Sequence, residues 1–213
     1  MASRQAGRVF AIVPAAGLRR RMGQPKLLMD LAGASVIERL LSALAIPSIT
    51  DRVVVLRPDD SRLAAAVTSA GGSVFRPDVA PPDMKASVVC ALDYVQRVHQ
   101  PTSDDAWLLT PADHPLLERS VVEAVVEAWR VRMPDALIPE YRRQKGHPVV
   151  FKWSVSRLLP TIPSDHGLNW LMRAGRMDVQ CLAVETPSIL QDLDTPEDYR
   201  RLQDQTGIDR RLD

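Results

Sequence analysis

Short apolar runs alternate along the chain with longer segments in which apolar residues recur every three or four positions. The short runs are typical of buried strands, and the longer segments are typical of amphipathic helices. The predicted strands cover residues 9–13, 52–56, 73–76, 106–110, 136–139, 148–151 and 179–183. The predicted helices cover residues 35–44, 59–70, 88–98 and 120–131, and a last one begins at residue 195. Because strands alternate with helices, we expect a three-layer α/β/α fold with a mainly parallel, Rossmann-like sheet.

Local signals mark the ends and the buried faces of these helices. Ser35 and Glu38 form a capping box at the start of the first helix. Thr195 is followed by Pro196, which is the expected N-cap and first-turn residue of the last helix. The apolar face of the third helix is predicted to comprise Val88, Ala91, Leu92, Val95 and Val98.

Composition limits the class of protein. The chain has 213 residues, of which 46% are hydrophobic, and this suits a single domain over residues 1–213 with a sizeable core. A formal net charge of +1 argues against a general nucleic-acid-binding surface, and no apolar run is long enough to span a bilayer. Cys90 and Cys181 lie among apolar residues, as buried thiols of a reducing compartment do. We therefore expect a soluble cytoplasmic protein with no nucleic-acid or membrane partner.

The first predicted strand runs into a loop with a high density of positive charge. Small residues at positions 14–17 follow the strand, then three arginines at positions 19–21, and the segment ends at Lys26. Open α/β sheets bind ligands at the carboxyl ends of their strands, and small residues let a ligand approach the backbone closely. The segment therefore indicates a phosphate-binding loop.

Two better-known nucleotide loops do not match this spacing. A Walker-type loop needs a lysine directly after its second glycine, whereas two residues separate Gly23 from Lys26. A dinucleotide fingerprint needs a glycine two positions after Gly17, where Arg19 stands. Neither motif is present.

The loop instead resembles the signature of nucleotidyltransferases, which join a nucleoside triphosphate to a phosphorylated acceptor and release pyrophosphate. The shared pattern is Ala-Ala-Gly, five residues, Gly, two residues and Lys, over residues 15–26. Within that superfamily it looks most like the molybdenum cofactor cytidylyltransferase branch. The resemblance implies the nucleotide-diphospho-sugar transferase fold, with a nucleotide-binding half at about residues 8–115 and an acceptor-binding half at about residues 116–205.

The same resemblance implies an activity and its requirements. We expect Mg²⁺-dependent transfer of a cytidylyl group from CTP to the phosphate of a molybdopterin-type cofactor, with Mn²⁺ as an alternative metal. The alanine at position 16 is the form associated with cytidine, whereas guanylyl-transferring relatives tend to carry glycine there. Transient contact with a molybdoenzyme or its chaperone would follow from such a product.

The resemblance also assigns roles within the loop. Arg21 and Lys26 would grip the triphosphate and act in catalysis, while Arg19 and Arg20 are either direct ligands or solvated side chains. The residues expected to bind the nucleotide are Ala15, Ala16, Gly17, Leu18, Arg21, Gly23 and Lys26.

Two acidic positions are candidates for the metal. Asp113 directly follows a predicted buried strand, so its carboxylate is expected at the same sheet edge as the loop, where Mg²⁺ usually takes one or two protein carboxylates. The segment at residues 192–198 resembles the closing motif of the family, which returns to the site beside the metal and is expected to supply the second carboxylate. Asp192 and Asp194 could both face the same side of an extended segment, and we favour Asp194 while Asp192 stays open.

Three further residues have two interpretations each. Ser87 belongs to a segment that resembles the nucleobase and ribose loop, or it only caps the following helix. His147, in a Gly-His-Pro sequence, is expected to contact the acceptor phosphate or pterin, or it is structural. His114 is a general base or, as we prefer, a turn histidine, because a phosphorylated acceptor is already anionic near neutral pH.

The chain departs from the family pattern at residues 83–85, which are Asp-Met-Lys where relatives commonly show Gly-Met-Ser. This difference leaves the base preference and the shape of that loop open. Asp165 and Gly167 match an acceptor-side loop of the cofactor cytidylyltransferases.

Other functions use the same kind of loop. Relatives act on sugar phosphates or on methylerythritol phosphate, and a non-catalytic nucleotide- or cofactor-binding protein of the same fold would also keep it. A glycosyltransferase of similar fold would carry Asp-x-Asp at the end of the central strand, where Ala112, Asp113 and His114 stand. The leading hypothesis is therefore a nucleotidyltransferase whose partners are a nucleoside triphosphate and a phosphorylated small molecule.

Overall fold

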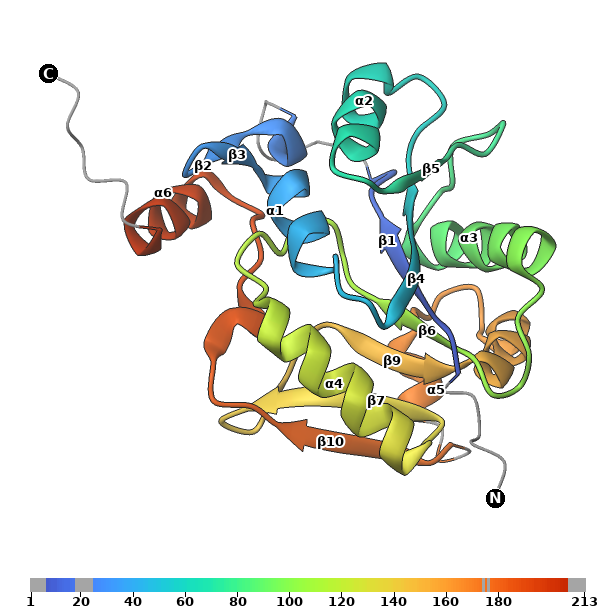
Figure 1. Cartoon of the computed structure of the whole chain (residues 1–213). Coiled ribbons are helices and arrows are strands. Elements are labelled where there is room, and N and C mark those ends of the chain that lie inside the picture. Colours follow the sequence, from blue (N-terminus) through green and yellow to red (C-terminus); the bar gives the residue numbers. More distant parts are fainter. Residues whose placement is uncertain (1–6, 18–24, 174, 176, 207–213) are drawn as a thin grey trace, which may run out of the picture.

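The computed structural model describes residues 7–17, 25–173, 175 and 177–206. Within these residues an eight-stranded sheet forms the centre, in the order β10-β7-β9-β6-β1-β4-β5, with β8 paired to β7 (Figure 1). Its strands are β1 (Val9–Pro14), β4 (Ile49–Val55), β5 (Ser73–Phe75), β6 (Ala106–Leu109), β7 (Ala136–Tyr141), β8 (Gln144–Lys145), β9 (Val149–Lys152) and β10 (Val179–Ala183). A separate hairpin joins β2 (Asp30–Leu31) to β3 (Ala34–Ser35).

Helices cover both faces of this sheet. The α-helices are α1 (Val36–Ala43), α2 (Ser61–Ser69), α3 (Met84–His99), α4 (Arg119–Arg132), α5 (Asn169–Arg173) and α6 (Pro196–Gln205), and the 3-10 helices are η1 (Lys26–Leu28), η2 (Trp153–Thr161) and η3 (Pro187–Leu190). One apolar cluster lies between the sheet and α1, α2 and α4, and a second lies between the sheet and α3, η2 and α5 (Figure 1). This confirms the predicted three-layer fold. None of the described helices is long and apolar enough to cross a membrane.

β1 shows why the first apolar run becomes the central strand. Val9, Ala11 and Val13 point into the first cluster, whereas Phe10 and Ile12 point into the second, and all five are fully buried. Successive side chains of a strand face opposite sides, so an uninterrupted apolar run suits a strand that is covered on both faces.

The sheet is mainly parallel, as predicted, but β9 is inserted antiparallel between β6 and β7, and the short β8 pairs antiparallel with β7. β1 is parallel to both β4 and β6, β4 is parallel to β5, and β7 is parallel to β10. β9 runs antiparallel to both β6 and β7. The short connection from β7 through β8 to β9 explains this, because adjacent parallel strands need a long crossover.

Two predictions about burial are wrong. Val98 is 55% exposed, because the repeat of α3, about 3.6 residues per turn, places it at the margin of the apolar face. His99, about three helical turns after Val88, lies on that face and pairs with Asp51 at 2.8 Å. Cys181 is exposed and Cys90 is only partly buried. Cys181 lies on β10, which is an edge strand and therefore leaves part of its surface uncovered.

The capping boxes at Ser35 and Thr195 are both present, so two helix starts are confirmed in detail. The sequence patterns missed the β2–β3 hairpin, the strand β8 and the helices η1, η2, α5 and η3. All but η2 hold five residues or fewer, and the nine-residue η2 contains Pro160, so none shows a clear helical or strand period.

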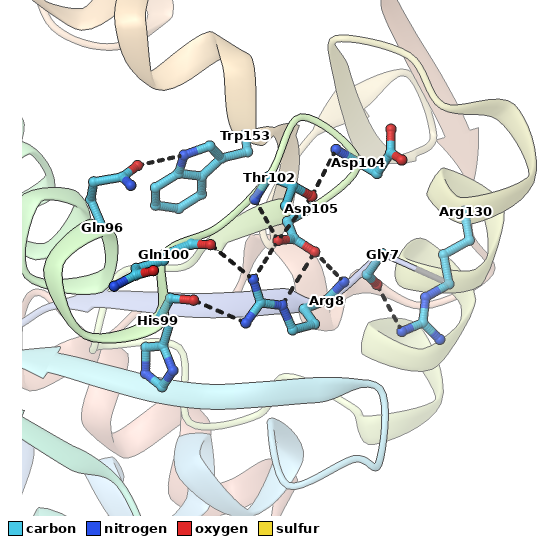
Figure 2. A network of polar contacts seen from close by, with 10 residues as sticks. All are labelled: Gly7, Arg8, Gln96, His99, Gln100, Thr102, Asp104, Asp105, Arg130 and Trp153. Carbon is cyan, nitrogen blue, oxygen red and sulfur yellow. Dashed lines mark hydrogen bonds and ion pairs between the residues drawn. The ribbon is translucent and has the colours of Figure 1, made fainter. Parts of the chain in front are cut away.

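A polar network ties the sheet together at the edge away from the carboxyl ends of β1 and β6 (Figure 2). The buried Asp105 carboxylate accepts from the backbone N–H of Arg8 at 2.7 Å, from its Nη2 at 2.8 Å and from the backbone N–H of Thr102 at 2.7 Å. Arg8 also donates to the carbonyls of His99 at 3.0 Å and Gln100 at 3.3 Å. The network therefore links β1, the start of β6 and the last turn of α3.

Candidate functional site

A cavity of about 410 Å³ opens at the carboxyl ends of the central parallel strands. Its walls come from the end of β1, from η1 and from the loops that follow β4, β5 and β6. The predicted site residues that line it are Ala15, Ala16, Gly17, Lys26, Ser87 and Asp113. The predicted site residues Leu18, Arg21 and Gly23, together with Arg19 and Arg20, lie outside the described residues.

The end of β1 forms a wall of small residues. The Ala15 N–H donates to the carbonyl of Val55 at 2.9 Å, which extends the pairing of β1 with β4 by one residue. Ala16 is buried against the cluster below α3. At Gly17 an added Cβ would meet no atom of the described residues within 4 Å, so packing against these residues does not require a glycine there. The open space suits the close approach of a ligand to the backbone.

Lys26 joins two carboxylates across the site. Its Nζ lies 2.6 Å from Asp113 Oδ2 and 2.9 Å from Asp194 Oδ1, and it donates to the carbonyl of Leu193 at 2.9 Å. An ammonium group has three donors, and three oxygens from two other segments accept them. The structure therefore brings together the loop lysine, the carboxylate after β6 and the carboxylate before α6.

Backbone contacts explain why Asp194 is the aspartate that reaches the lysine. Leu193 is fully buried, and its N–H donates to the carbonyl of Asp113 at 2.9 Å. The Asp198 carboxylate, which caps α6, accepts from the N–H of Asp194 at 3.2 Å. The closing motif is thus held at both ends. Asp194 contacts the ammonium, and Asp192, on the other side of Leu193, is not among the contacts that Lys26 makes with described residues.

The electrostatics of this cluster keep both partners charged. Burial alone would raise the pKa of Asp113, but the hydrogen bond from His114 and the charge of Lys26 outweigh it and lower the pKa to about 2. Burial would lower the pKa of Lys26, but the two carboxylates raise it above its ordinary value. At neutral pH Lys26 is therefore an ammonium and Asp113 an ionised carboxylate.

The donor set fits a metal that shares its coordination with a phosphate. Asp113 and Asp194 each place one carboxylate oxygen against the same cation. In the part of the chain that the structure describes, no group of three or more His, Cys, Asp and Glu residues could enclose a metal ion. Mg²⁺ commonly binds one or two protein carboxylates and completes its octahedron with water and phosphate oxygens.

His114 lies behind Asp113 and not in the wall of the cavity. It is buried, its Nδ1 lies 3.2 Å from Asp113 Oδ1, and its carbonyl accepts from the N–H of Leu117 at 3.3 Å. Since Lys26 contacts Oδ2 of the same carboxylate, the two side chains fix both oxygens of Asp113. The histidine is therefore a turn residue that also orients the aspartate.

His147 packs against His114, with the two rings edge to face at 5.2 Å. It does not line the cavity, and its buried Nδ1 has no hydrogen-bond partner among the described residues. Burial and the neighbouring His114 lower the pKa of His147 to about 4. The preceding Gly146 is required by packing, because an added Cβ would lie 2.3 Å from the carbonyl oxygen of Ile189.

Ser87 lines the cavity, and it is not the helix cap. Asp83 caps α3, and its carboxylate accepts from the N–H of Ala86 at 2.7 Å. Ser87 donates its hydroxyl to the carbonyl of Asp83 at 3.0 Å. The capping alternative for Ser87 is therefore wrong.

Arg57 is a wall residue that the sequence interpretation missed. It follows β4, it lines the cavity, and its Nε lies 3.4 Å from Asp59 Oδ1. The sequence holds a signal for this role, because Arg57 comes directly after a predicted strand, and the residues that follow such strands lie at the edge of the sheet where ligands bind.

Comparison with known proteins identifies the family. The sequence profile of the MobA-like NTP transferase domain matches residues 11–180. The chain belongs to the MobA-like NTP transferase domain family. Its members are nucleotidyltransferases, so this MobA-like protein is an enzyme of that class, as predicted.

Three relatives show the range of the MobA-like proteins. The chain is 26% identical over 192 residues to the molybdenum cofactor cytidylyltransferase of Escherichia coli (strain K12), over 90% of this chain and 93% of that protein. It is 26% identical over 204 residues to the phosphoenolpyruvate guanylyltransferase of Rubrobacter xylanophilus, over 94% and 96% of the two chains. The crystal structure of Rv0371c with manganese, from Mycobacterium tuberculosis, superposes with a TM-score of 0.73 at 25% identity, over 94% of this chain and 100% of that one.

Proposed function

We propose that the protein transfers the cytidylyl group of CTP to the terminal phosphate of a molybdopterin-type cofactor, with Mg²⁺ or Mn²⁺ as the metal. The observation that carries the proposal is the Lys26 ammonium held between Asp113 and Asp194 beside a cavity that starts at Ala15 and Ala16. Paired carboxylates next to a fixed cation suit a metal-bound triphosphate, whose charge must be neutralised from several sides.

The donor side lies in residues 8–115. Gly17, Leu18 and Gly23 would surround the phosphates with backbone N–H groups, while Arg21 and Lys26 would neutralise them as a fork and a point charge. Ala15, Ala16 and Ser87 would bind the nucleoside, since they line the cavity next to the loop.

Asp113 and Asp194 would hold the metal, which supplies charge neutralisation at the α-phosphate when it is bound. An oxygen of the acceptor phosphate attacks the α-phosphorus and forms a new P–O bond. The bond from the α-phosphorus to the oxygen that bridges to the β-phosphate breaks, and pyrophosphate leaves with those electrons. Because the acceptor phosphate is already anionic, the step needs no protein base, and His114 orients Asp113.

The acceptor side lies in residues 116–205, with His147 as the candidate contact. Its buried Nδ1, which finds no partner among the described residues, supports this role, because a buried polar nitrogen is costly unless it is hydrogen-bonded and a ligand would supply that bond. The product, a nucleotide-linked cofactor, would then pass to a molybdoenzyme or its chaperone.

Guanylyl transfer to a different phosphorylated acceptor is the second candidate. It is favoured by the match to the Rubrobacter xylanophilus guanylyltransferase along almost the whole of both chains. Cytidine is the first choice because position 16 is alanine, the form that the family resemblance associates with cytidine.

Pyrophosphate release from CTP, GTP, ATP and UTP, each with and without molybdopterin and Mg²⁺, tests the proposal. We expect release with CTP and molybdopterin together, and only in the presence of the metal. Release with GTP and not with CTP would replace cytidylyl by guanylyl transfer. Metal-dependent CTP binding without release for any acceptor would indicate a nucleotide-binding protein that transfers nothing.

A further inference from the structure

Lys85 connects the wall of the nucleotide cavity to a distant turn. It is the second residue of α3, and its Nζ donates to the carbonyl of Pro163 at 2.9 Å and to that of His166 at 3.1 Å. Met84, directly before it, and Ser87, two positions after it, line the cavity. The Lys85 side chain therefore links the first turn of α3, which forms part of the cavity wall, to the segment that follows η2.

The turn that Lys85 contacts rests on a packed base. The N–H of His166 donates to the carbonyl of Pro163 at 3.0 Å, so the lysine shares the acceptor that closes the turn. Beyond the turn, Leu168 and Leu171 are buried in the same apolar cluster as Val88 of α3. The apolar contacts fix the base of this segment, and Lys85 fixes its exposed end.

The position of Lys85 is costly for the helix that carries it. A cation in the first turn opposes the helix dipole, and an acidic residue would stabilise α3 better there. The two carbonyls that accept from Lys85 lie 78 and 81 residues further along the chain. The long-range link, and not the stability of α3, accounts for a lysine at this position.

We propose that Lys85 is a positioning residue that couples the turn at residues 163–167 to the nucleotide cavity, so that bound nucleotide organises the acceptor side. The inference rests on the proposed function for the identity of the two substrates. A nucleotide that contacts the wall at Met84 and Ser87 limits the motion of the first turn of α3. Lys85 transmits this restraint to the turn through its two hydrogen bonds.

Amide hydrogen exchange of the peptide covering residues 164–171 tests the link without any acceptor. The variant Lys85→Met keeps the length of the side chain and removes the donor, and the control Arg97→Met removes an exposed cation from the last turn of the same helix. We expect exchange in this peptide to be about tenfold faster in Lys85→Met than in the wild type, and unchanged in Arg97→Met. CTP with Mg²⁺ should slow the exchange in the wild type and in Arg97→Met, but not in Lys85→Met.

Steady-state kinetics separate positioning from a general loss of structure. Lys85→Met should raise the KM for molybdopterin about tenfold and leave the KM for CTP within about twofold of the wild-type value. Lys85→Arg, which keeps a charged donor, should bring the KM for molybdopterin most of the way back to the wild-type value. Equal exchange in the wild type and in Lys85→Met would overturn the inference, and so would an equal loss of affinity for CTP and molybdopterin. If no nucleotide is turned over, the proposed function fails, but the exchange of residues 164–171 still decides whether Lys85 holds the turn.

Discussion

The Lys26 ammonium and the Asp113 carboxylate lie 2.6 Å apart, although 87 residues separate them in the sequence. Lys26 is the first residue of η1, directly after the arginine-rich loop, and Asp113 follows β6. The pair therefore ties η1 to the carboxyl edge of the sheet. Each partner also keeps the other charged, which is the state that a triphosphate and a metal require.

Replacing Asp113 by asparagine should lower kcat for pyrophosphate release by about 10³-fold, because the variant loses the carboxylate proposed to hold the metal and the charged partner of Lys26. The exposed carboxylate of Asp93 on α3 offers a matched control, and Asp93→Asn should keep the wild-type rate. Turnover of Asp113→Asn near the wild-type value would contradict the assignment of Asp113 as a metal ligand.

The pair Asp192 and Asp194 allows a test within one short segment. Asp194→Asn should weaken Mn²⁺ binding in the presence of CTP about tenfold or more, as measured by titration calorimetry, because only Asp194 reaches the Lys26 cluster. Asp192→Asn serves as the control and should bind Mn²⁺ as the wild type does. Equal losses in the two variants would contradict the assignment of Asp194.

Asp113 and Asp194 also show how much of the site could be predicted from the sequence. Asp113 could be predicted, because it directly follows a buried apolar run and such residues lie at the edge where ligands bind. The choice of Asp194 over Asp192 could not be derived, since it depends on the burial of Leu193 and on its backbone bond to Asp113. Contacts of this kind join segments that no local pattern relates.

Two predictions about burial differ from the structure for other reasons. The sequence pattern places Val98 on the apolar face of α3, but the repeat of about 3.6 residues puts His99 there, where it pairs with Asp51, and leaves Val98 at the margin. Cys181 lies in an apolar run that looks buried, whereas its exposure depends on the place of β10 at the edge of the sheet. Sheet order is a property of the whole fold, so a run of residues cannot specify it.

The pKa of His147 predicts a pH dependence of stability. The unfolded chain protonates this side chain below about pH 6.5, but the folded protein resists protonation until about pH 4, so the free energy of unfolding falls as the pH drops through that window. Between pH 7.5 and pH 5 the loss from this residue should be about 2 kcal/mol. Urea unfolding of the wild type and of His147→Gln at both pH values measures it. The same pH dependence in both proteins would show that His147 does not contribute.

The network around Asp105 should contribute to the stability of the fold and not to the catalytic activity. Asp105→Asn should lower the free energy of unfolding by about 2–3 kcal/mol, because the buried carboxylate accepts charge-assisted bonds from Arg8 and a backbone bond from Thr102 (Figure 2). Thermal unfolding followed by circular dichroism gives the difference. Glu197→Gln breaks an exposed pair with Arg200 and should change stability by less than about 1 kcal/mol. A neutral effect of Asp105→Asn would contradict this account of the sheet edge.

Isotope transfer from CTP tests the central claim most directly. The protein would be incubated with molybdopterin, Mg²⁺ and CTP labelled with ³²P on either the α- or the γ-phosphate, and the products separated by chromatography. Cytidylyl transfer predicts that the α-label appears in the molybdopterin product and the γ-label in pyrophosphate. The account would be contradicted if the γ-label entered the acceptor, or if the α-label remained entirely in CTP or free CMP while the same reaction with GTP labelled the acceptor.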